Sequence, residues 1–481
     1  MKKLRELYDI DSDVEVLGIS LNSKEVKKGD LFVCTMGITA DRHDFIDEAI
    51  SNGAVACVVS KDVGEKSVPL IKVENTNDEF PYLCQRFYDY PDKELKVIAT
   101  TGTDGKTTLA TMIRILLGED ICGYLGTNGV DCTGFHDDIV NTTPDAHLVF
   151  KYLREFVNRG CKYASIETSS EAFYRKRLTP FEFDVSIFTN ISPEHMNIHK
   201  TFEHYLNCKL ELFKQTKKDG YCIINRDEEH FEVVKDACNG KVLTYGQDES
   251  CDMRIVDYKL TSKNSYIKFK YLDQEFEVTS PTLALYNIYN LAAALLACLV
   301  SGHTLEQLLP NIEKIHVDGR MEVLDTKDNY SVIVDFAHTP NAIENILKFA
   351  TNIEHNRIIT VIGSAGGRDS EKRPVIGNVC DKYSDYVIFT TDDPRHEDPK
   401  DICNMMVKDL KDKSKYEIII DRGEAVDKAI DMAEENDIVL LLCKGNEPYQ
   451  ITATGYEPYS EMDEAYKAIK KKSEKKSKNN N

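Results

Sequence analysis

The sequence predicts an α/β protein of three domains. We expect a small α/β domain at the N-terminus, a central parallel-sheet domain with a P-loop, and a C-terminal domain with a Rossmann-like sheet. The chain has 481 residues, more than a single hydrophobic core usually organises. Apolar β-branched runs alternate with helical patterns in two separate stretches, and the run at 96–101 leads into a glycine-containing turn that opens a helix.

The N-terminal domain is expected over residues 1–91. Its strand-like runs at 31–35 and 54–59 lie around a helical pattern at 45–51. Short β-branched runs beside one amphipathic helix are typical of a small α/β unit.

The central and C-terminal domains, expected over 92–317 and 318–481, repeat one alternation of strand and helix. The central strands are predicted at 97–100, 164–167, 185–189 and 222–225. The C-terminal strands are predicted at 332–336, 358–362, 386–390, 418–421 and 439–442. Alternation of this kind is typical of a mostly parallel, doubly wound sheet with helices on both faces.

The composition disfavours several kinds of partner. Acidic side chains outnumber basic ones by 81 to 60, and a net charge of −21 disfavours binding to a nucleic-acid backbone. The 14 cysteines form no Cys-x-x-Cys pair and no apolar signal follows Met1, so we expect a cytoplasmic protein. The longest apolar run, 291–300, is about half a membrane span. We expect a monomer that binds neither nucleic acid nor a membrane, with a solvated, frayed tail at 470–481.

The turn at 102–108 has the composition of a P-loop, the phosphate-binding turn of mononucleotide-binding domains. Backbone N–H groups of such a turn, and of the helix behind it, point at phosphate oxygens. Lys106 supplies positive charge for the outer phosphates, and Thr107 offers a hydroxyl to Mg²⁺. The longer general motif would place glycine at Thr100, so the match is partial. The residues expected to contact the nucleotide are Gly102, Thr103, Asp104, Gly105, Lys106, Thr107 and Thr108.

Three polar residues follow later in the central stretch. Glu167 ends a predicted strand, and ligands of parallel sheets bind beyond the carboxyl ends of strands, so Glu167 is expected to meet the Mg²⁺ at Thr107. From the residue pattern alone, His195 favours a structural role. Lys209 sits beside the apolar face of a helical pattern, so the pattern predicts a side chain that reaches solvent.

The C-terminal loops carry a second set of charges. Asp335 ends a predicted strand and suits a ribose hydroxyl, because a carboxylate accepts hydrogen bonds with both oxygens. Arg368, Arg395 and Glu447 fall in strand-end loops that should share one face. Guanidinium groups bind a carboxylate and acids bind an ammonium, so this set suits a zwitterion.

These residues, in this order, resemble the Mur ligase family, and above all its tripeptide-forming branch. The resemblance covers nearly the whole chain, and its longest strings are 21–33, 141–145, 286–290 and 317–322. It implies a ligase that uses ATP and Mg²⁺ to add a free diamino acid to UDP-MurNAc-L-Ala-D-Glu, through an acyl phosphate, in peptidoglycan precursor synthesis. Meso-diaminopimelate is favoured over L-lysine because Arg395 and Glu447 are both retained.

The resemblance also implies roles for individual residues. Besides a UDP loop at 38–40, the UDP-linked substrate would contact Leu21, Ser23, Asn141, Thr142, Thr143, Ser169, Arg175 and Arg177. The acceptor amino acid would contact Arg368, Asp392, Asp393, Pro394, Arg395 and Glu447. Asn287 and Asn290 would lie at the adenine side. The catalytic residues would be Lys106, His195 and a carbamoylated Lys209, with Thr107, Glu167, His195 and Lys209 holding metal.

Four departures from the family pattern stand out. Asp104 replaces Asn in the P-loop, Glu171 replaces His after a serine pair, and Cys443 replaces glycine at the acceptor site. Asp393 replaces the Asn of an Asp-Asn-Pro-Arg motif, and its extra carboxylate favours an acceptor with an ammonium-bearing side chain. The alternatives are another Mur-type ligase, a folylpolyglutamate-type ligase, and a nucleotide-binding protein without ligase activity.

Overall fold

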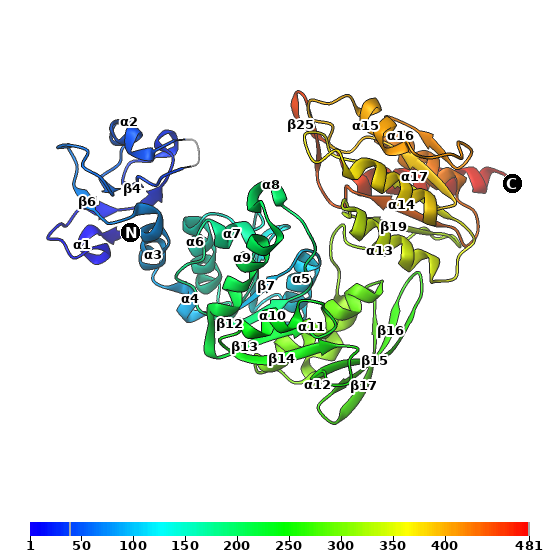
Figure 1. The fold of residues 1–481 in the computed structure, drawn as a ribbon, viewed down its shortest axis with the longest axis horizontal. Helices are drawn as coiled ribbons and strands as arrows, with labels where there is room; N and C mark the ends of the chain where they lie inside the picture. The colour runs from blue at the N-terminus through cyan, green and yellow to red at the C-terminus, as the bar shows by residue number, and fades with distance from the viewer. Residues whose placement is uncertain (38–39, 480–481) are drawn as a thin grey trace. The chain divides into compact units, whose positions relative to one another are not determined.

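The computed structural model describes residues 1–37 and 40–479, which form two compact units (Figure 1). The first unit contains Met1–Met253 and Ala293–Leu308, and the second contains Arg254–Ala292 and Leu309–Asn481. Helix α11 (Leu285–Val300) runs from the second unit into the first. Ile38 and Thr39, in the expected UDP loop, lie outside the described residues. Among the described helices, none is both long and apolar enough to cross a bilayer.

The N-terminal part of the first unit is a small parallel sheet with the strand order β3-β4-β5-β6. Its strands are β3 (Gly18–Ser20), β4 (Asp30–Val33), β5 (Ala56–Val59) and β6 (Leu70–Lys72). The predicted runs at 31–35 and 54–59 are β4 and β5, and the predicted helix is α2 (Ile46–Ser51). The other elements are β1 (Lys2–Lys3), α1 (Leu4–Leu7), β2 (Glu15–Val16), η1 (Ser23–Glu25), η2 (Arg42–Phe45), α3 (Thr76–Phe87) and α4 (Pro91–Glu94).

A larger sheet in the same unit carries the P-loop. The strands that the first unit contributes to it lie in the order β10-β9-β8-β11-β7-β12-β13-β14, and the neighbours from β8 to β14 are parallel. The bounds are β7 (Lys96–Thr101), β8 (Cys122–Gly126), β9 (Gly129–Cys132), β10 (Phe135–Asp137), β11 (Tyr163–Glu167), β12 (Phe183–Phe188), β13 (Thr216–Asn225) and β14 (Lys241–Gly246). The four predicted central strands are β7, β11, β12 and β13. Because β7 lies between β11 and β12, the P-loop leaves the middle of the sheet.

Two helices of this unit fix the residues of interest. Helix α5 (Lys106–Leu117) follows the P-loop, and α9 (Phe202–Lys214) begins after Thr201, whose hydroxyl accepts from the His204 amide at 3.2 Å. Helix α9 buries Leu206, Leu210 and Phe213 in the core. The remaining helices are α6 (Ala146–Asn158), α7 (Ser170–Tyr174), α8 (Met196–His199), α10 (Phe231–Asp236) and α12 (Leu305–Leu308).

The second unit contains a six-stranded sheet in the order β18-β19-β23-β20-β21-β22, parallel except for β18. Its strands are β18 (Glu322–Leu324), β19 (Ser331–Asp335), β20 (Ile358–Ile362), β21 (Tyr386–Phe389), β22 (Tyr416–Ile418) and β23 (Ile438–Leu442). The helices between them are α13 (Pro340–Thr351), α14 (Lys372–Tyr383), α15 (Pro399–Val407) and α16 (Arg422–Met432). This confirms the doubly wound C-terminal sheet. The strand predicted at 418–421 is wrong in its bounds, because Asp421 instead caps α16 by accepting from the Glu424 amide at 2.9 Å.

Several elements of the second unit were not predicted. They are β15 (Met253–Leu260), β16 (Ser265–Tyr271), β17 (Gln274–Ser280), η3 (Leu309–Lys314), β24 (Tyr449–Thr452), β25 (Gly455–Pro458) and α17 (Glu461–Asn479). The expected frayed tail is helical as far as Asn479. Lys472 of α17 is buried and donates to the carbonyls of Ile430 and Asp431, at 2.8 and 3.0 Å, near the C-terminus of α16. An ammonium there compensates the carbonyl dipoles of the last helical turn.

Candidate functional site

The P-loop, residues 102–105, joins β7 to α5 and depends on two glycines. A side chain at Gly102 would overlap the hydroxyl of Thr189, so only glycine fits there. Gly105 has a φ of 86°, and α5 begins at the next residue. The amides of Lys106 and Thr107 lie in the first turn of α5, where the helix itself supplies no acceptor. These two N–H groups are therefore donors for a phosphate.

Residues that follow β12 brace the P-loop from outside. The Thr103 and Asp104 amides donate to the backbone and side-chain oxygens of Asn190, at 2.9 and 3.0 Å. Thr189 donates through its hydroxyl to the Asp104 carbonyl at 2.7 Å, and the hydroxyls of Thr103 and Tyr205 are 3.0 Å apart. Sequence patterns did not single out these braces. These hydrogen bonds fix the conformation of the loop.

Two lysines meet at this loop. The Lys106 ammonium donates to the carbonyls of Gly102 and Thr103 at 3.0 and 2.8 Å, and Lys209 donates to the same Gly102 carbonyl at 2.6 Å. Lys209 is only 2% exposed, so the expectation that it reaches solvent is wrong. Burial, and then the charge of Lys106, lower the pKa of Lys209 well below its usual range. Lys209 is therefore more readily uncharged than an ordinary lysine.

Glu167 ends β11 and is fully buried beside the P-loop. The Thr107 hydroxyl donates to Glu167 Oε2 at 3.0 Å, so the structure brings together the two predicted metal-binding residues. Glu167 also accepts from the Tyr124 hydroxyl at 2.5 Å, and from the Thr127 amide and hydroxyl at 2.9 and 3.1 Å. These donors are neutral. Tyr124 and Thr127 were not predicted, although they lie at the carboxyl end of β8, where ligands of parallel sheets bind.

Residues expected to grip the UDP-linked substrate gather around the end of β11. The Thr143 hydroxyl donates to the Glu167 carbonyl at 2.9 Å and accepts from the Ser169 amide at 3.0 Å. Arg177 binds the Thr143 carbonyl at 2.9 Å and the Asp145 carboxylate at 2.7 Å. Thr143, Ser169 and Arg177 therefore form one hydrogen-bonded group.

Other candidates for the same substrate lie at the rim of this group or on the small sheet. Thr142 is 3.1 Å from the Thr127 hydroxyl, while Asn141 is exposed. Arg175 pairs with Glu171, the residue that departs from the family pattern, at 2.5 Å. On the small sheet Leu21 is half-buried, and Ser23 is buried and donates to Glu48 of α2. In this structure Ser23 therefore holds α2 in place.

His195 lies just before α8 with a largely exposed side chain. Its ring centroid is 6.2 Å from that of Tyr205, and Nε2 is 3.6 Å from Glu194 Oε2. Partial burial and the charges of Lys106 and Lys209 lower the pKa of His195 against the opposing effect of Glu194. His195 thus lies within electrostatic reach of both lysines and favours the neutral form, in which imidazole ligates metals.

The residues of the second unit that were expected to contact the nucleotide all form hydrogen bonds within the protein. Asn287 and Asn290 lie near the start of α11, are buried, and bond to each other at 3.1 Å. Asp335 accepts from the Met321 and Ala337 amides, each at 2.7 Å. The carboxylate that was expected to bind a ribose therefore fixes the backbone around β19, and a ribose could use only its remaining lone pairs.

A buried lysine that the sequence did not reveal joins the loops that carry residues 392–395 and Glu447. These loops, with the loop of Arg368, are called the acceptor loops because they carry the residues expected to contact the acceptor amino acid. The Lys444 ammonium donates to Asp393 at 2.7 Å and to Glu447 at 2.8 Å, and lies 3.9 Å from Asp392. Burial opposes the charge, but these carboxylates overcome it and raise the pKa of Lys444. The extra carboxylate of Asp393, which was expected to face a ligand ammonium, is paired in this structure with the ammonium of Lys444.

The two acceptor arginines are less constrained. Arg368 is exposed, and Arg395 is half-buried in a left-handed conformation with a φ of 54°. The Arg395 amide donates to the Ile451 carbonyl at 2.9 Å, which joins the Pro394–Arg395 turn to β24. The Arg395 Nε is buried and has no hydrogen-bond partner among the described residues. A buried unpaired donor is costly, so it favours a ligand that accepts from it.

Three sequence profiles of the Mur ligase family match this chain. They are the family's catalytic domain at residues 15–94, its middle domain at 100–298 and its glutamate ligase domain at 319–445. The chain is 35% identical to UDP-N-acetylmuramoyl-L-alanyl-D-glutamate--2,6-diaminopimelate ligase of Oceanobacillus iheyensis over an alignment of 491 positions, which covers 98% of this chain and 100% of that protein. The chain belongs to the Mur ligase family. Mur ligases are ATP-dependent ligases, so this protein is an enzyme of that class.

Two further comparisons agree with this assignment. The Mur ligase is 37% identical over 441 residues to the Aquifex aeolicus protein of the same name, with 90% of each chain covered. A solved structure named UDP-N-acetylmuramoyl-L-alanyl-D-glutamate--2,6-diaminopimelate ligase matches with a TM-score of 0.72 and 28% identity, over 98% of this chain and 99% of that one. The predicted three-domain α/β fold is therefore confirmed.

One further arginine of this Mur ligase holds the acceptor loops together. Arg373, fully buried at the start of α14, makes two hydrogen bonds to Glu397 at 2.7 and 2.9 Å. Glu397 also accepts from the Gly367 amide at 2.6 Å. The pair therefore links the loop that carries Arg368 to the loop that carries Arg395. Sequence patterns did not reveal it, because both residues look like ordinary surface charges until the two loops meet.

Proposed function

We propose that this Mur ligase adds 2,6-diaminopimelate to UDP-MurNAc-L-Ala-D-Glu with ATP as the energy source, in peptidoglycan precursor synthesis. Relatives that carry this name match the chain almost from end to end, which supports the substrate assignment. The observation that carries the catalytic assignment is the meeting of three groups: the P-loop, Glu167 hydrogen-bonded to Thr107, and Lys209 at the Gly102 carbonyl.

The oxygens at Thr107 and Glu167 fit a magnesium ion. Mg²⁺ prefers hard oxygen ligands and binds through one or two carboxylates together with substrate phosphates. Glu167 is a fully buried carboxylate, and the hydrogen bonds that the structure gives it come from neutral donors. A bound Mg²⁺ would neutralise charge on the phosphates of ATP. We assign Thr107 and Glu167 as its ligands.

The reaction we propose has two steps on the substrates. The D-Glu side-chain carboxylate attacks the terminal phosphorus of ATP, the bond to ADP breaks, and an acyl phosphate forms. The amine of diaminopimelate then attacks the acyl carbon, loses a proton and displaces phosphate. In both steps Lys106 and the first-turn amides of α5 hold the phosphoryl charge, so positioning and electrostatics supply the rate.

We assign Lys209 a carbamate form during catalysis. Its lowered pKa makes the uncharged amine accessible, and that amine adds to CO2 and releases one proton to give an anion. The change converts repulsion between Lys106 and Lys209 into attraction. A carbamate oxygen would then supply a hard ligand to a second Mg²⁺, and the neutral His195 ring would add a single nitrogen ligand.

The acceptor loops favour diaminopimelate over L-lysine. Diaminopimelate carries a carboxylate at each end, whereas lysine carries only one. Arg368 and Arg395 offer guanidinium groups, while Asp393 and Glu447 are already paired with Lys444. A second carboxylate on the acceptor would find an arginine, and the bare side-chain ammonium of lysine would be repelled by it.

The remaining assignments follow the chain. We propose that residues 1–91 bind the UDP moiety through Leu21 and Ser23, that 92–317 bind ATP and the peptide, and that 318–481 bind the amino acid. Asn141, Thr142, Thr143, Ser169, Arg175 and Arg177 are assigned to the muramoyl-dipeptide, and Asn287, Asn290 and Asp335 to the nucleoside. We propose a monomeric enzyme of the cytoplasm.

The test is a product assay with defined substrates. Release of ADP and formation of the tripeptide would be measured with UDP-MurNAc-L-Ala-D-Glu, ATP, Mg²⁺ and either meso-diaminopimelate or L-lysine. Turnover is expected only when the UDP-linked dipeptide is present, with diaminopimelate preferred. A folate and glutamate pair tests the folylpolyglutamate alternative. If no amino acid from a broad panel supported phosphate release, the result would contradict ligase activity.

A further inference from the structure

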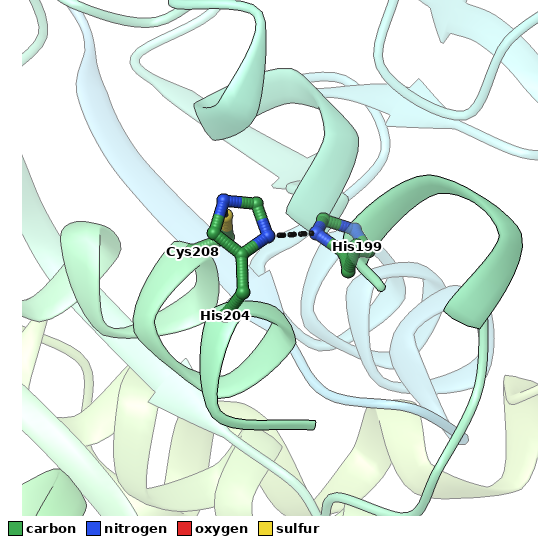
Figure 2. Close-up of side chains that lie close together, drawn as sticks. All are labelled: His199, His204 and Cys208. Carbon is green, nitrogen blue, oxygen red and sulfur yellow. Dashed lines mark hydrogen bonds between the residues drawn. The ribbon is translucent and has the colours of Figure 1, made fainter. Parts of the chain in front are cut away.

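A second group of metal-ligating side chains lies where α8 meets α9, and the proposed reaction does not use it. His199 is the last residue of α8, and His204 and Cys208 lie four residues apart on α9 (Figure 2). The Nδ1 atoms of the two histidines are 3.1 Å apart, and Cys208 Sγ is 3.9 Å from His204 Nε2. One ligand atom from each residue falls within 4.8 Å of the others. Three side chains from two helices therefore converge on one point.

The spacing is close to that of a tetrahedral zinc site. Zinc bonds of about 2.0–2.1 Å to nitrogen and 2.3 Å to sulfur place neighbouring ligand atoms roughly 3.3–3.6 Å apart. The 3.1 Å distance is measured to His204 Nδ1 and the 3.9 Å distance to His204 Nε2, and one ligand atom from each of the three residues lies within 4.8 Å of the others. A rotation of the His204 ring would bring one of its nitrogens to the same ion as His199 Nδ1 and Cys208 Sγ. The i, i+4 spacing on α9 places both ligands on the same helical face.

The surroundings of His199 aim it at the other two residues. His199 Nε2 is 2.9 Å from the Ser170 hydroxyl, so a proton held there leaves the Nδ1 lone pair facing His204. The Tyr174 ring packs against both imidazoles, with centroids 6.0 and 5.3 Å away. His199 and Cys208 are buried. The group thus has an oriented ligand, an outer hydrogen bond and an apolar cover, as metal sites have.

The ligand set differs from the other carboxylate and histidine clusters of the described chain. Asp392, Asp393 and Glu447 enclose Lys444, which already supplies their positive charge. A second cluster, at 316–322, is mostly exposed. The ligands at α8 and α9 are instead two imidazoles and one thiol, which select zinc-like ions over the Mg²⁺ expected at Thr107 and Glu167.

We propose that His199, His204 and Cys208 bind one zinc-class divalent ion, with a fourth position open to water. The ion clamps the α8–α9 junction. His199 lies 5.2 Å from the ring of Tyr205, whose hydroxyl contacts Thr103 of the P-loop, and Cys208 precedes Lys209. The clamp therefore steadies the helix that presents Tyr205 and Lys209 to the P-loop.

Cobalt substitution of the full-length protein tests the site without relying on activity. The protein, stripped of metal with a chelator, would be titrated with Co²⁺ and its visible and near-ultraviolet absorption recorded, and Zn²⁺ affinity would be measured by competition with a chromophoric chelator. We expect one equivalent of Co²⁺, a sulfur-to-cobalt charge-transfer band and tetrahedral visible bands. Zinc should displace the cobalt and raise the midpoint of thermal unfolding.

Matched variants separate this site from incidental binding. Cys208→Ser should abolish the charge-transfer band, and Cys208→Ser and His204→Ala should each weaken Zn²⁺ binding by about 100-fold or more, since loss of an outer-shell partner alone costs about 10–100-fold. Ser170→Ala should weaken it by about tenfold. Cys251→Ser, a half-buried thiol elsewhere, should behave as wild type. A charge-transfer band retained in Cys208→Ser, or wild-type protein that binds Zn²⁺ no more tightly than His204→Ala, would overturn the proposal.

Discussion

Lys106 and Lys209 donate to one carbonyl oxygen, that of Gly102, at 3.0 and 2.6 Å. Two ammonium groups on one oxygen repel each other, and burial together with the charge of Lys106 lowers the pKa of Lys209 well below its usual range. The repulsion is removed if Lys209 is uncharged and reversed if it becomes an anion. The shared carbonyl therefore favours the uncharged form of Lys209 beside Lys106.

Replacing Lys209 should remove most of the activity in a way that small anions can repair. Lys209→Ala is expected to lower kcat by about 100-fold or more, the usual cost of losing one electrostatic group at the reacting centre. Acetate or another short carboxylate should restore part of the rate, because it can place an anion in the vacated space. Initial rates of ADP release would be compared with those of Lys214→Ala, an exposed lysine on the same helix. The assignment would be contradicted if carboxylates failed to restore activity to Lys209→Ala and the wild-type protein also showed no added mass of a carbamate.

The lowered pKa of Lys209 also predicts how stability depends on pH. Between the folded pKa and the unfolded value near 10.4, the unfolded chain binds more protons than the folded one. Stability should therefore rise with pH across that range, relative to Lys209→Met, which has no proton to lose. In CO2-free buffer the thermal midpoint of Lys209→Met should exceed that of the wild type at neutral pH, and the gap should narrow as the pH rises. A gap that widens with pH would show that Lys209 is not held in an environment that disfavours its charge.

Lys106 should be needed for turnover and not for binding of the UDP-linked substrate. Lys106→Ala removes the charge that holds the phosphoryl group, so kcat should fall by about a thousandfold. Binding of UDP-MurNAc-L-Ala-D-Glu, measured by calorimetry, should persist because that ligand has other contacts. Lys151→Ala, an exposed lysine on α6, is the control. Appreciable ligation by Lys106→Ala would argue against its place at the phosphates.

Glu167→Gln tests the proposed magnesium ligand without removing a buried side chain. The amide oxygen can still accept from Tyr124 and Thr127, so the thermal midpoint should change little. The negative charge is lost, so the Mg²⁺ concentration needed for half-maximal rate should rise at least tenfold and kcat should fall by about 100-fold. The readout is a Mg²⁺ titration of ADP release. An unchanged Mg²⁺ requirement would assign the metal to other residues.

Local sequence patterns were sufficient to predict the central strands of the two larger sheets and the glycine turn that follows β7. A strand, a glycine turn and a helix are consecutive in the chain, so β7, the loop and α5 could be recognised from residues 96–117 alone. The pairing of Thr107 with Glu167 followed from the rule that ligands bind at the carboxyl ends of parallel strands. Both inferences use information contained in one segment or one topological rule.

The burial of lysines could not be predicted in this way. Helical periodicity places Lys209 beside an apolar face, but whether it reaches solvent depends on the Gly102 carbonyl, 107 residues earlier in the chain. Lys444 likewise looks like a loop charge until Asp393, 51 residues away, closes on it. A buried charge depends on partners that are distant in sequence, and periodicity carries no information about them.

The Lys444 cluster gives the strongest stability prediction. Lys444→Met would leave the buried Asp393 and the half-buried Glu447 without a cation, and breaking a buried pair costs about 3–5 kcal/mol. Asp393→Asn alone leaves Lys444 bound to Glu447 and should cost less. When Lys444→Met is made in the Asp393→Asn protein, one fewer carboxylate is left without a cation. The loss of stability caused by Lys444→Met should then be about 1–3 kcal/mol smaller than in the wild type. Lys467→Met, which breaks an exposed pair with Glu464, should change stability by less than about 1 kcal/mol. Urea-induced unfolding, followed with a probe in the second unit, measures all four. Strict additivity would mean that Asp393 and Lys444 do not interact, and that the extra carboxylate is free for the acceptor after all.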